Sequence, residues 1–169
     1  MFGAVALIVA GVGFGIFWGL GLLEFDAPWS AGLAVHGVWM GSLSVGLIRL
    51  VQPLRGTAAA AGWAGAVATV IGMLTAFPLF GVGLIVIATI EWLQGTPRPA
   101  AAALAAGAIL LLGSLPLEGR FDGSGTPELG TPAALLFAPA ILLISLGLNL
   151  LGLRQLQGER RKVTVAPVR

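Results

Sequence analysis

Long apolar runs separated by short polar segments dominate this sequence. Hydrophobic residues make up 57% of the 169 residues, and Asp, Glu, Lys and Arg together only 9%. Soluble domains carry about 25% charged residues, so a chain of this composition cannot cover a water-exposed surface. Apolar runs of about 20 residues match the thickness of the hydrocarbon core of a bilayer. The sequence therefore predicts an all-α integral membrane protein.

We expect a bundle of about six transmembrane helices and no soluble domain. The expected helices cover residues 4–22, 31–50, 57–76, 79–94, 100–115 and 132–152. Phe77 and Pro78 separate the third run from the fourth, because proline ends or kinks a helix at the preceding residue. The fourth run is short, so a re-entrant segment stays open as an alternative to a full span.

The distribution of basic residues predicts the orientation of the helices. Six helices with a cytoplasmic N-terminus leave only Arg120 outside. The basic residues then on the cytoplasmic side are Arg49, Arg55, Arg98, Arg154, Arg160, Arg161, Lys162 and Arg169. The positive-inside rule favours this arrangement over a five-helix model. We expect both termini in the cytoplasm, a plasma-membrane location, and residues 153–169 as a basic tail beside an anionic leaflet.

Several classes of protein are disfavoured by composition and motifs. The chain has no cysteine, which excludes disulfides and thiolate metal sites. The pI of about 10.5 comes from basic residues spread along the chain, so we expect no nucleic-acid partner. No P-loop, GxSxG or HExxH motif is present, and the sequence leans away from an enzyme.

Small residues recur at helical spacing in the first three apolar runs. Inside a bilayer, helices associate through close approach at small residues, since lipid tails are as apolar as leucine. The glycines that we expect to pack helices together are Gly11, Gly15, Gly19, Gly37, Gly41 and Gly62. The stripe on the first helix predicts packing within the chain. A seam between two copies of the protein is the alternative.

His36 is the foremost candidate for chemistry. It is the single histidine of the chain and lies in the second apolar run. An intramembrane ionisable group is a functional candidate by default, although a hydrogen-bonded packing histidine is the commoner case. Met73 lies at a similar depth in the third run, so a His/Met site for haem or copper is one hypothesis.

Three further residues are candidates for polar contacts. Glu91 lies near the inner end of the fourth run, where we expect it to pair with a basic residue such as Arg98 or Arg55. Ser145 and Asn149 predict an interhelical hydrogen bond from the sixth run.

Two tryptophans differ in their expected depth. We place Trp18 near the outer membrane interface and Trp39 deeper, as a packing residue.

One stretch carries a family resemblance. His36, Trp39 and Gly41, followed by Pro53 and Arg55, resemble a helix of the copper-resistance D type of membrane proteins, which pair a histidine with Trp-x-Gly-Gly and a following Pro-x-Arg. Here a serine replaces the second glycine and the histidine spacing is shorter. No functional residue is transferred from this resemblance.

The sequence leaves three functional hypotheses. The first is a non-catalytic accessory or structural subunit of a membrane complex, because few polar groups lie in the apolar runs. The second is a haem- or copper-binding protein that uses His36. The third is a small-solute permease. The expected partners are the lipid bilayer, and other membrane subunits or a second copy that contacts the stripe of Gly11, Gly15 and Gly19.

Overall fold

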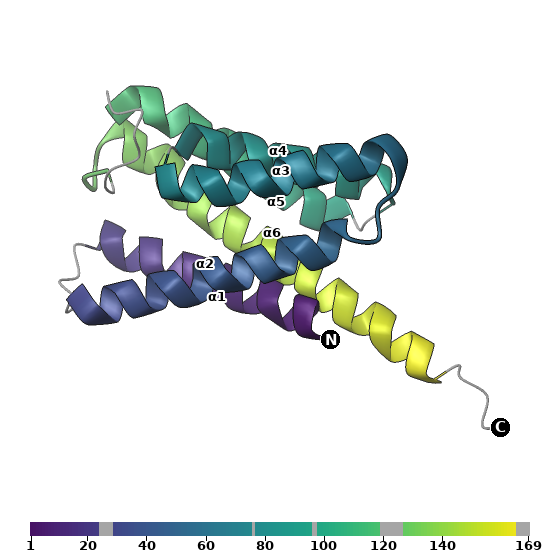
Figure 1. The fold of residues 1–169 in the computed structure, drawn as a ribbon. Coiled ribbons are helices and arrows are strands. Elements are labelled where there is room, and N and C mark those ends of the chain that lie inside the picture. Colours follow the sequence, from purple (N-terminus) through teal and green to yellow (C-terminus); the bar gives the residue numbers. More distant parts are fainter. Residues whose placement is uncertain (24–28, 76, 96–97, 119–126, 165–169) are drawn as a thin grey trace.

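The described residues of the protein form a bundle of six α-helices (Figure 1). The computed structural model describes residues 1–23, 29–75, 77–95, 98–118 and 127–164. The helices are α1 (Phe2–Leu22), α2 (Trp29–Val51), α3 (Gly56–Thr75), α4 (Phe77–Leu93), α5 (Arg98–Glu118) and α6 (Pro132–Thr164). The described ranges contain no strand, and the all-α prediction is confirmed.

Five of the six helices are long and apolar enough to cross a membrane. The exception is α4, which has 17 residues. At about 1.5 Å per residue it is shorter than a hydrocarbon core of about 30 Å. The structure thus agrees with a helical membrane bundle that contains one short helix, in the region where the sequence left a re-entrant segment open.

The helix boundaries differ from the expected ones around proline and at the end of α6. Pro78 does not precede α4 but is its second residue. Proline is tolerated there because the first N–H groups of a helix have no acceptor within the helix. Pro116 lies inside the last turn of α5. The backbone of α6 stays helical through residues 153–164, which were expected only as a polar tail.

Consecutive helices run in opposite directions, and both chain termini lie towards the same end of the bundle (Figure 1). That end holds Arg49, Arg55, Arg98 and Arg154, and we call it the basic end. Figure 1 shows α6 passing between α1 and α2 on one side and α3, α4 and α5 on the other. Because α6 packs against both α1 and α5, it joins the two groups.

Close approach of the helices depends mainly on glycines that the sequence did not single out. A Cβ atom added to Gly72 of α3 would collide with the backbone of Phe80 in α4. A Cβ on Gly147 of α6 would lie 2.8 Å from the backbone nitrogen of Leu104 in α5. Real Cβ atoms do not approach backbone this closely. Small residues are therefore required at the α3–α4 and α5–α6 contacts.

The predicted packing glycines divide into two groups. A Cβ on Gly11 would lie 2.8 Å from the carbonyl oxygen of Ser145, and one on Gly15 would lie 3.0 Å from its Oγ. A Cβ on Gly62 would lie 2.5 Å from Leu54. By contrast, Gly19, Gly37 and Gly41 have no described neighbour within 4 Å of an added Cβ. The chain's own α6 thus covers the middle of the α1 stripe, and a seam between two copies stays a prediction.

Candidate polar site at the basic end

A pocket with a volume of about 900 Å³ opens between α1, α2, α4 and α6 at the basic end. Its lining is both charged and apolar. The charged residues are Arg49 of α2, Glu91 of α4 and Arg154 of α6. The uncharged lining residues are Met1, Phe2, Gly3, Leu50, Gln52, Pro53, Gln94, Leu151, Gln155 and Gly158. Charged residues from three different helices thus converge on one cavity.

Glu91 is the buried charge of this site. It is 6% exposed and lies in the last turn of α4. Its Oε2 accepts a hydrogen bond from Nη1 of Arg154 at 3.4 Å, and the two side chains form an ion pair. A carboxylate is rarely buried without a partner, because its desolvation is costly. The expectation that Glu91 pairs with a basic residue is confirmed, but the partner is Arg154 of α6 and not Arg98 or Arg55, the examples that the sequence suggested.

Arg49 supplies a second guanidinium to the pocket. It lies in the last turn of α2, where a cation interacts favourably with the helix dipole. Its Nη1 donates a hydrogen bond to Oε1 of Gln52 at 3.4 Å. Among the residues that the structure describes, Arg49 has no carboxylate partner. Its charge is therefore not neutralised by the pocket, whereas that of Arg154 is paired.

The start of α1 forms another wall of the pocket. Phe2 and Gly3 line it, and the side chain of Met1, the residue before the helix, does not cap the first N–H groups. A Cβ atom on Gly3 would lie 2.5 Å from the Cβ of Arg49, so glycine lets α1 approach the stem of that arginine closely. The N-terminus of a helix favours negative charge. This wall adds to the positive potential that Arg49 creates.

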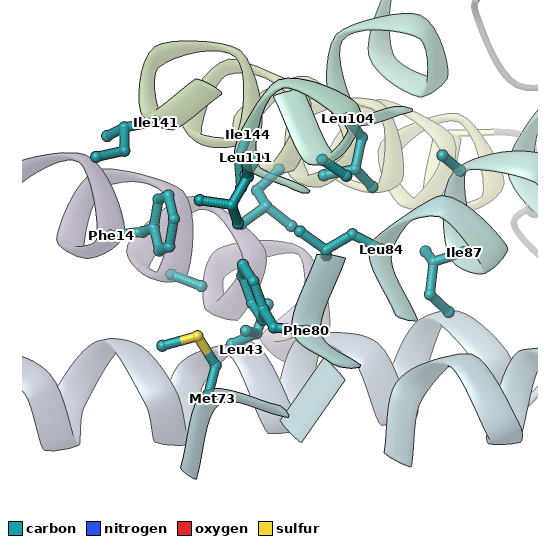
Figure 2. Packing of buried hydrophobic residues seen from close by; sticks show 14 of the residues in the cluster. Phe14, Leu43, Met73, Phe80, Leu84, Ile87, Leu104, Leu111, Ile141 and Ile144 are labelled. Carbon is teal, nitrogen blue, oxygen red and sulfur yellow. The ribbon is translucent and has the colours of Figure 1, made fainter. Parts of the chain in front are cut away.

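His36 lies away from this pocket, in an aromatic cluster. Its ring centroid is 4.8 Å from that of Phe17 in α1 and 5.2 Å from that of Trp39. Its Nδ1 is buried and has no hydrogen-bond partner among the described residues. Met73 belongs to the buried cluster that also contains Phe80 and Leu43 (Figure 2). The ring contacts of His36 among the described residues are with Phe17 and Trp39, and the His36–Met73 site for haem or copper stays a prediction.

The described residues contain no group of three or more His, Asp or Glu side chains that could hold a metal ion.

The polar residues of α6 make the contact that the sequence predicted. Ser145 Oγ donates a hydrogen bond to the carbonyl oxygen of Gly11 at 2.6 Å, which joins α6 to α1. Asn149 Nδ2 donates to the carbonyl oxygen of Ser145 at 2.8 Å, within α6. The interhelical bond is thus confirmed for Ser145, while Asn149 donates its hydrogen bond within α6.

The structure tests the prediction for Trp39 and gives the surroundings of Trp18. Trp39 is fully buried, as expected for a packing residue. Trp18 is 7% exposed and packs edge-on against Phe77, with the ring centroids 4.9 Å apart. Its predicted depth near the outer membrane interface stays a prediction, and within the bundle its ring lies among α1, α4 and α6.

Sequence reasoning named Glu91 but missed the site around it. Arg49 and Arg154 were used only to orient the chain, and the pocket depends on the order in which helices surround one another. One signal was available, because Arg49, Glu91 and Arg154 all lie near the predicted inner ends of their apolar runs. The chain matches no protein-family model, and no similar curated protein or solved structure is found.

Proposed function

We propose that this chain is a non-catalytic, multi-pass membrane protein that binds an anionic group in the pocket at its basic end. The observation that carries the proposal is the pocket of about 900 Å³, whose charged lining among the described side chains is Arg49, Arg154 and Glu91. Guanidinium groups form strong, directional hydrogen bonds with phosphate and carboxylate oxygens. The uncapped start of α1 adds N–H donors to the same wall.

The setting of the proposal is the cytoplasmic side of the plasma membrane. Support comes from the arginines of the described chain, since Arg49, Arg55, Arg98 and Arg154 all belong to the basic end. Basic residues concentrate on the cytoplasmic side of membrane proteins. In this orientation the pocket opens towards the cytoplasmic head groups and the solution beyond them.

The test is a titration of the full chain, in an uncharged detergent, with inorganic phosphate and with sulfate. We expect both anions to raise the thermal unfolding midpoint, because a ligand that binds only the folded state stabilises it by about 2.7 kcal/mol at one hundred times its Kd. Arg49→Gln removes the guanidinium that has no carboxylate partner and should abolish most of this stabilisation.

Arg55→Gln is the matched control. Arg55 is exposed at the same end and does not line the pocket. An equal loss in both variants would mean that the anions respond to general surface charge, and it would refute a pocket. An unchanged midpoint of the unsubstituted chain at high phosphate and sulfate would refute anion binding altogether.

Two further roles predicted from the sequence stay open to direct tests. Purification of the native protein as a lone monomer would count against an accessory subunit of a larger complex. Flux across liposomes that contain the protein, above the leak of empty liposomes, would favour a permease. The haem or copper hypothesis depends on His36 and is tested spectroscopically below.

A further inference from the structure

We propose that the anionic group is the phosphate of a phospholipid whose head group enters the pocket from the surrounding leaflet. This inference rests on the proposed function and names its ligand class. It follows from the depth of the two arginines, the mixed lining of the pocket and its net charge.

The depth of the arginines matches the level of lipid phosphates. About 20 residues of α-helix cross a hydrocarbon core of about 30 Å. Counted from the first residue of α2, Trp29, that length ends next to Arg49. Counted from the first residue of α6, Pro132, it ends about one turn before Arg154. Both guanidiniums therefore lie just beyond the apolar layer, where phosphates begin.

The lining of the pocket is suited to an amphiphile. Its apolar members include Leu50 and Leu151, which are buried, and Phe2, which is 83% exposed. In a membrane, an exposed phenylalanine at the rim faces lipid rather than water. A soluble anion contacts only the polar wall, whereas a phospholipid places its phosphate on the arginines and its glycerol and first acyl carbons along the apolar rim.

The charge of the pocket favours a lipid that carries one net negative charge. Among the described side chains of the lining, two arginines face one carboxylate. A singly anionic head group such as that of phosphatidylglycerol neutralises the positive charge that these side chains leave. The choline head group of phosphatidylcholine brings its own cation towards Arg49 and Arg154, and repulsion then reduces its affinity. Basic residues next to a membrane helix are a known recognition device for anionic lipids.

The experiment is native mass spectrometry of the full chain released from uncharged detergent micelles. Phosphatidylglycerol, phosphatidylcholine and glycerol 3-phosphate are titrated separately. We expect phosphatidylglycerol to bind about tenfold more tightly than phosphatidylcholine. Arg49→Gln should remove most of that preference. Arg49→Lys should keep part of it, since the charge stays while the bidentate geometry is lost.

Arg55→Gln again serves as the control, because it removes one positive charge from the same end but outside the pocket. Arg49 is exposed, so its replacement leaves the buried core intact, and an unfolding curve of each variant verifies the fold. Equal loss of lipid preference in Arg49→Gln and Arg55→Gln would overturn the inference in favour of diffuse surface attraction.

The remaining outcomes separate this inference from the proposed function. Binding of glycerol 3-phosphate or inorganic phosphate without any preference for phosphatidylglycerol would overturn the lipid assignment and leave the anion-binding pocket standing. Absence of binding by every anion, lipid or soluble, would overturn both.

Discussion

The basic end and the aromatic cluster differ in how they fill space. At the basic end, charged side chains surround a hollow of about 900 Å³. In the aromatic cluster, Phe14 packs against Trp39 and Phe80 with ring centroids 5.3 and 5.8 Å away. All three of these side chains are essentially inaccessible. The comparison separates a region that can accept a ligand from a region that holds the helices together.

The two regions also differ in whether their buried polar atoms have partners. Glu91 at the basic end is buried with a cationic partner. The indole Nε1 atoms of Trp18 and Trp39 are buried with no hydrogen-bond partner among the described residues. A buried polar group without a partner costs about 1–3 kcal/mol. Each favourable contact between two aromatic rings contributes about 0.5–1.5 kcal/mol, and the cluster contains several such contacts. Packing therefore outweighs hydrogen bonding in the cluster, while electrostatics shapes the pocket.

Removal of a central ring should break the cluster and leave the pocket chemistry alone. Phe14 contacts aromatic side chains from α1, α2 and α4. Phe14→Ala should lower the free energy of unfolding by about 3 kcal/mol, through lost contacts and a residual cavity. Unfolding in mixed micelles of rising dodecyl sulfate content measures the change. Phe2→Ala, at an exposed phenylalanine, is the control for stability. Equal losses in the two variants would contradict the assignment of Phe14 to the packing core.

A methyl group between α3 and α4 should have a somewhat smaller effect. Gly72→Ala drives a Cβ into the backbone of Phe80, and the helices must separate to relieve it. Overpacking of this kind costs about 1–3 kcal/mol. Gly41→Ala is the matched control, because no described atom lies within 4 Å of its added Cβ. The same unfolding assay should show loss in Gly72→Ala alone. Stability that is unchanged in Gly72→Ala would mean that α3 and α4 do not touch there.

Replacement of His36 has the smallest expected effect on stability and tests whether the aromatic cluster only packs. If the cluster only packs, the purified protein is colourless, and His36→Ala costs about 1 kcal/mol of stability through lost ring contacts. Anion binding at the basic end should not change. Absorption spectra of oxidised and dithionite-reduced protein, with metal analysis of the same sample, provide the measurement. A Soret band or stoichiometric copper that His36→Ala abolishes would instead make this region a redox site.

Much of the fold was predictable because one local property, the length of each apolar run, decides whether a segment becomes a helix. An apolar run of about 20 residues must satisfy its own backbone hydrogen bonds in lipid, and a helix is the way a single segment does so. Each of the expected runs is a helix in the structure. The position of Pro78 was misjudged, because the same residue can stop one helix or stand in the first turn of the next. Only the backbone course between α3 and α4 distinguishes these two cases.

The site was less predictable, because it depends on which helices become neighbours. The sequence identifies Glu91 as an ionisable group near a helix end that is costly to bury. Its partner Arg154, however, lies 63 residues further along the chain. The same holds for glycine. Gly37 and Gly41 have the spacing of a packing motif and face open space, while Gly72 and Gly147 meet the backbone of the adjacent helix.

The sequence by itself thus determined an all-helical chain with several spans and its basic residues concentrated at one end. The tertiary structure alone decided that α6 lies between the two helix groups, that Arg154 meets Glu91, and that a pocket with Arg49 opens beside them. The physical reason is that hydrophobicity drives every apolar helix into lipid equally. It does not select neighbours, which are chosen by close contacts between small residues and by a few polar pairs.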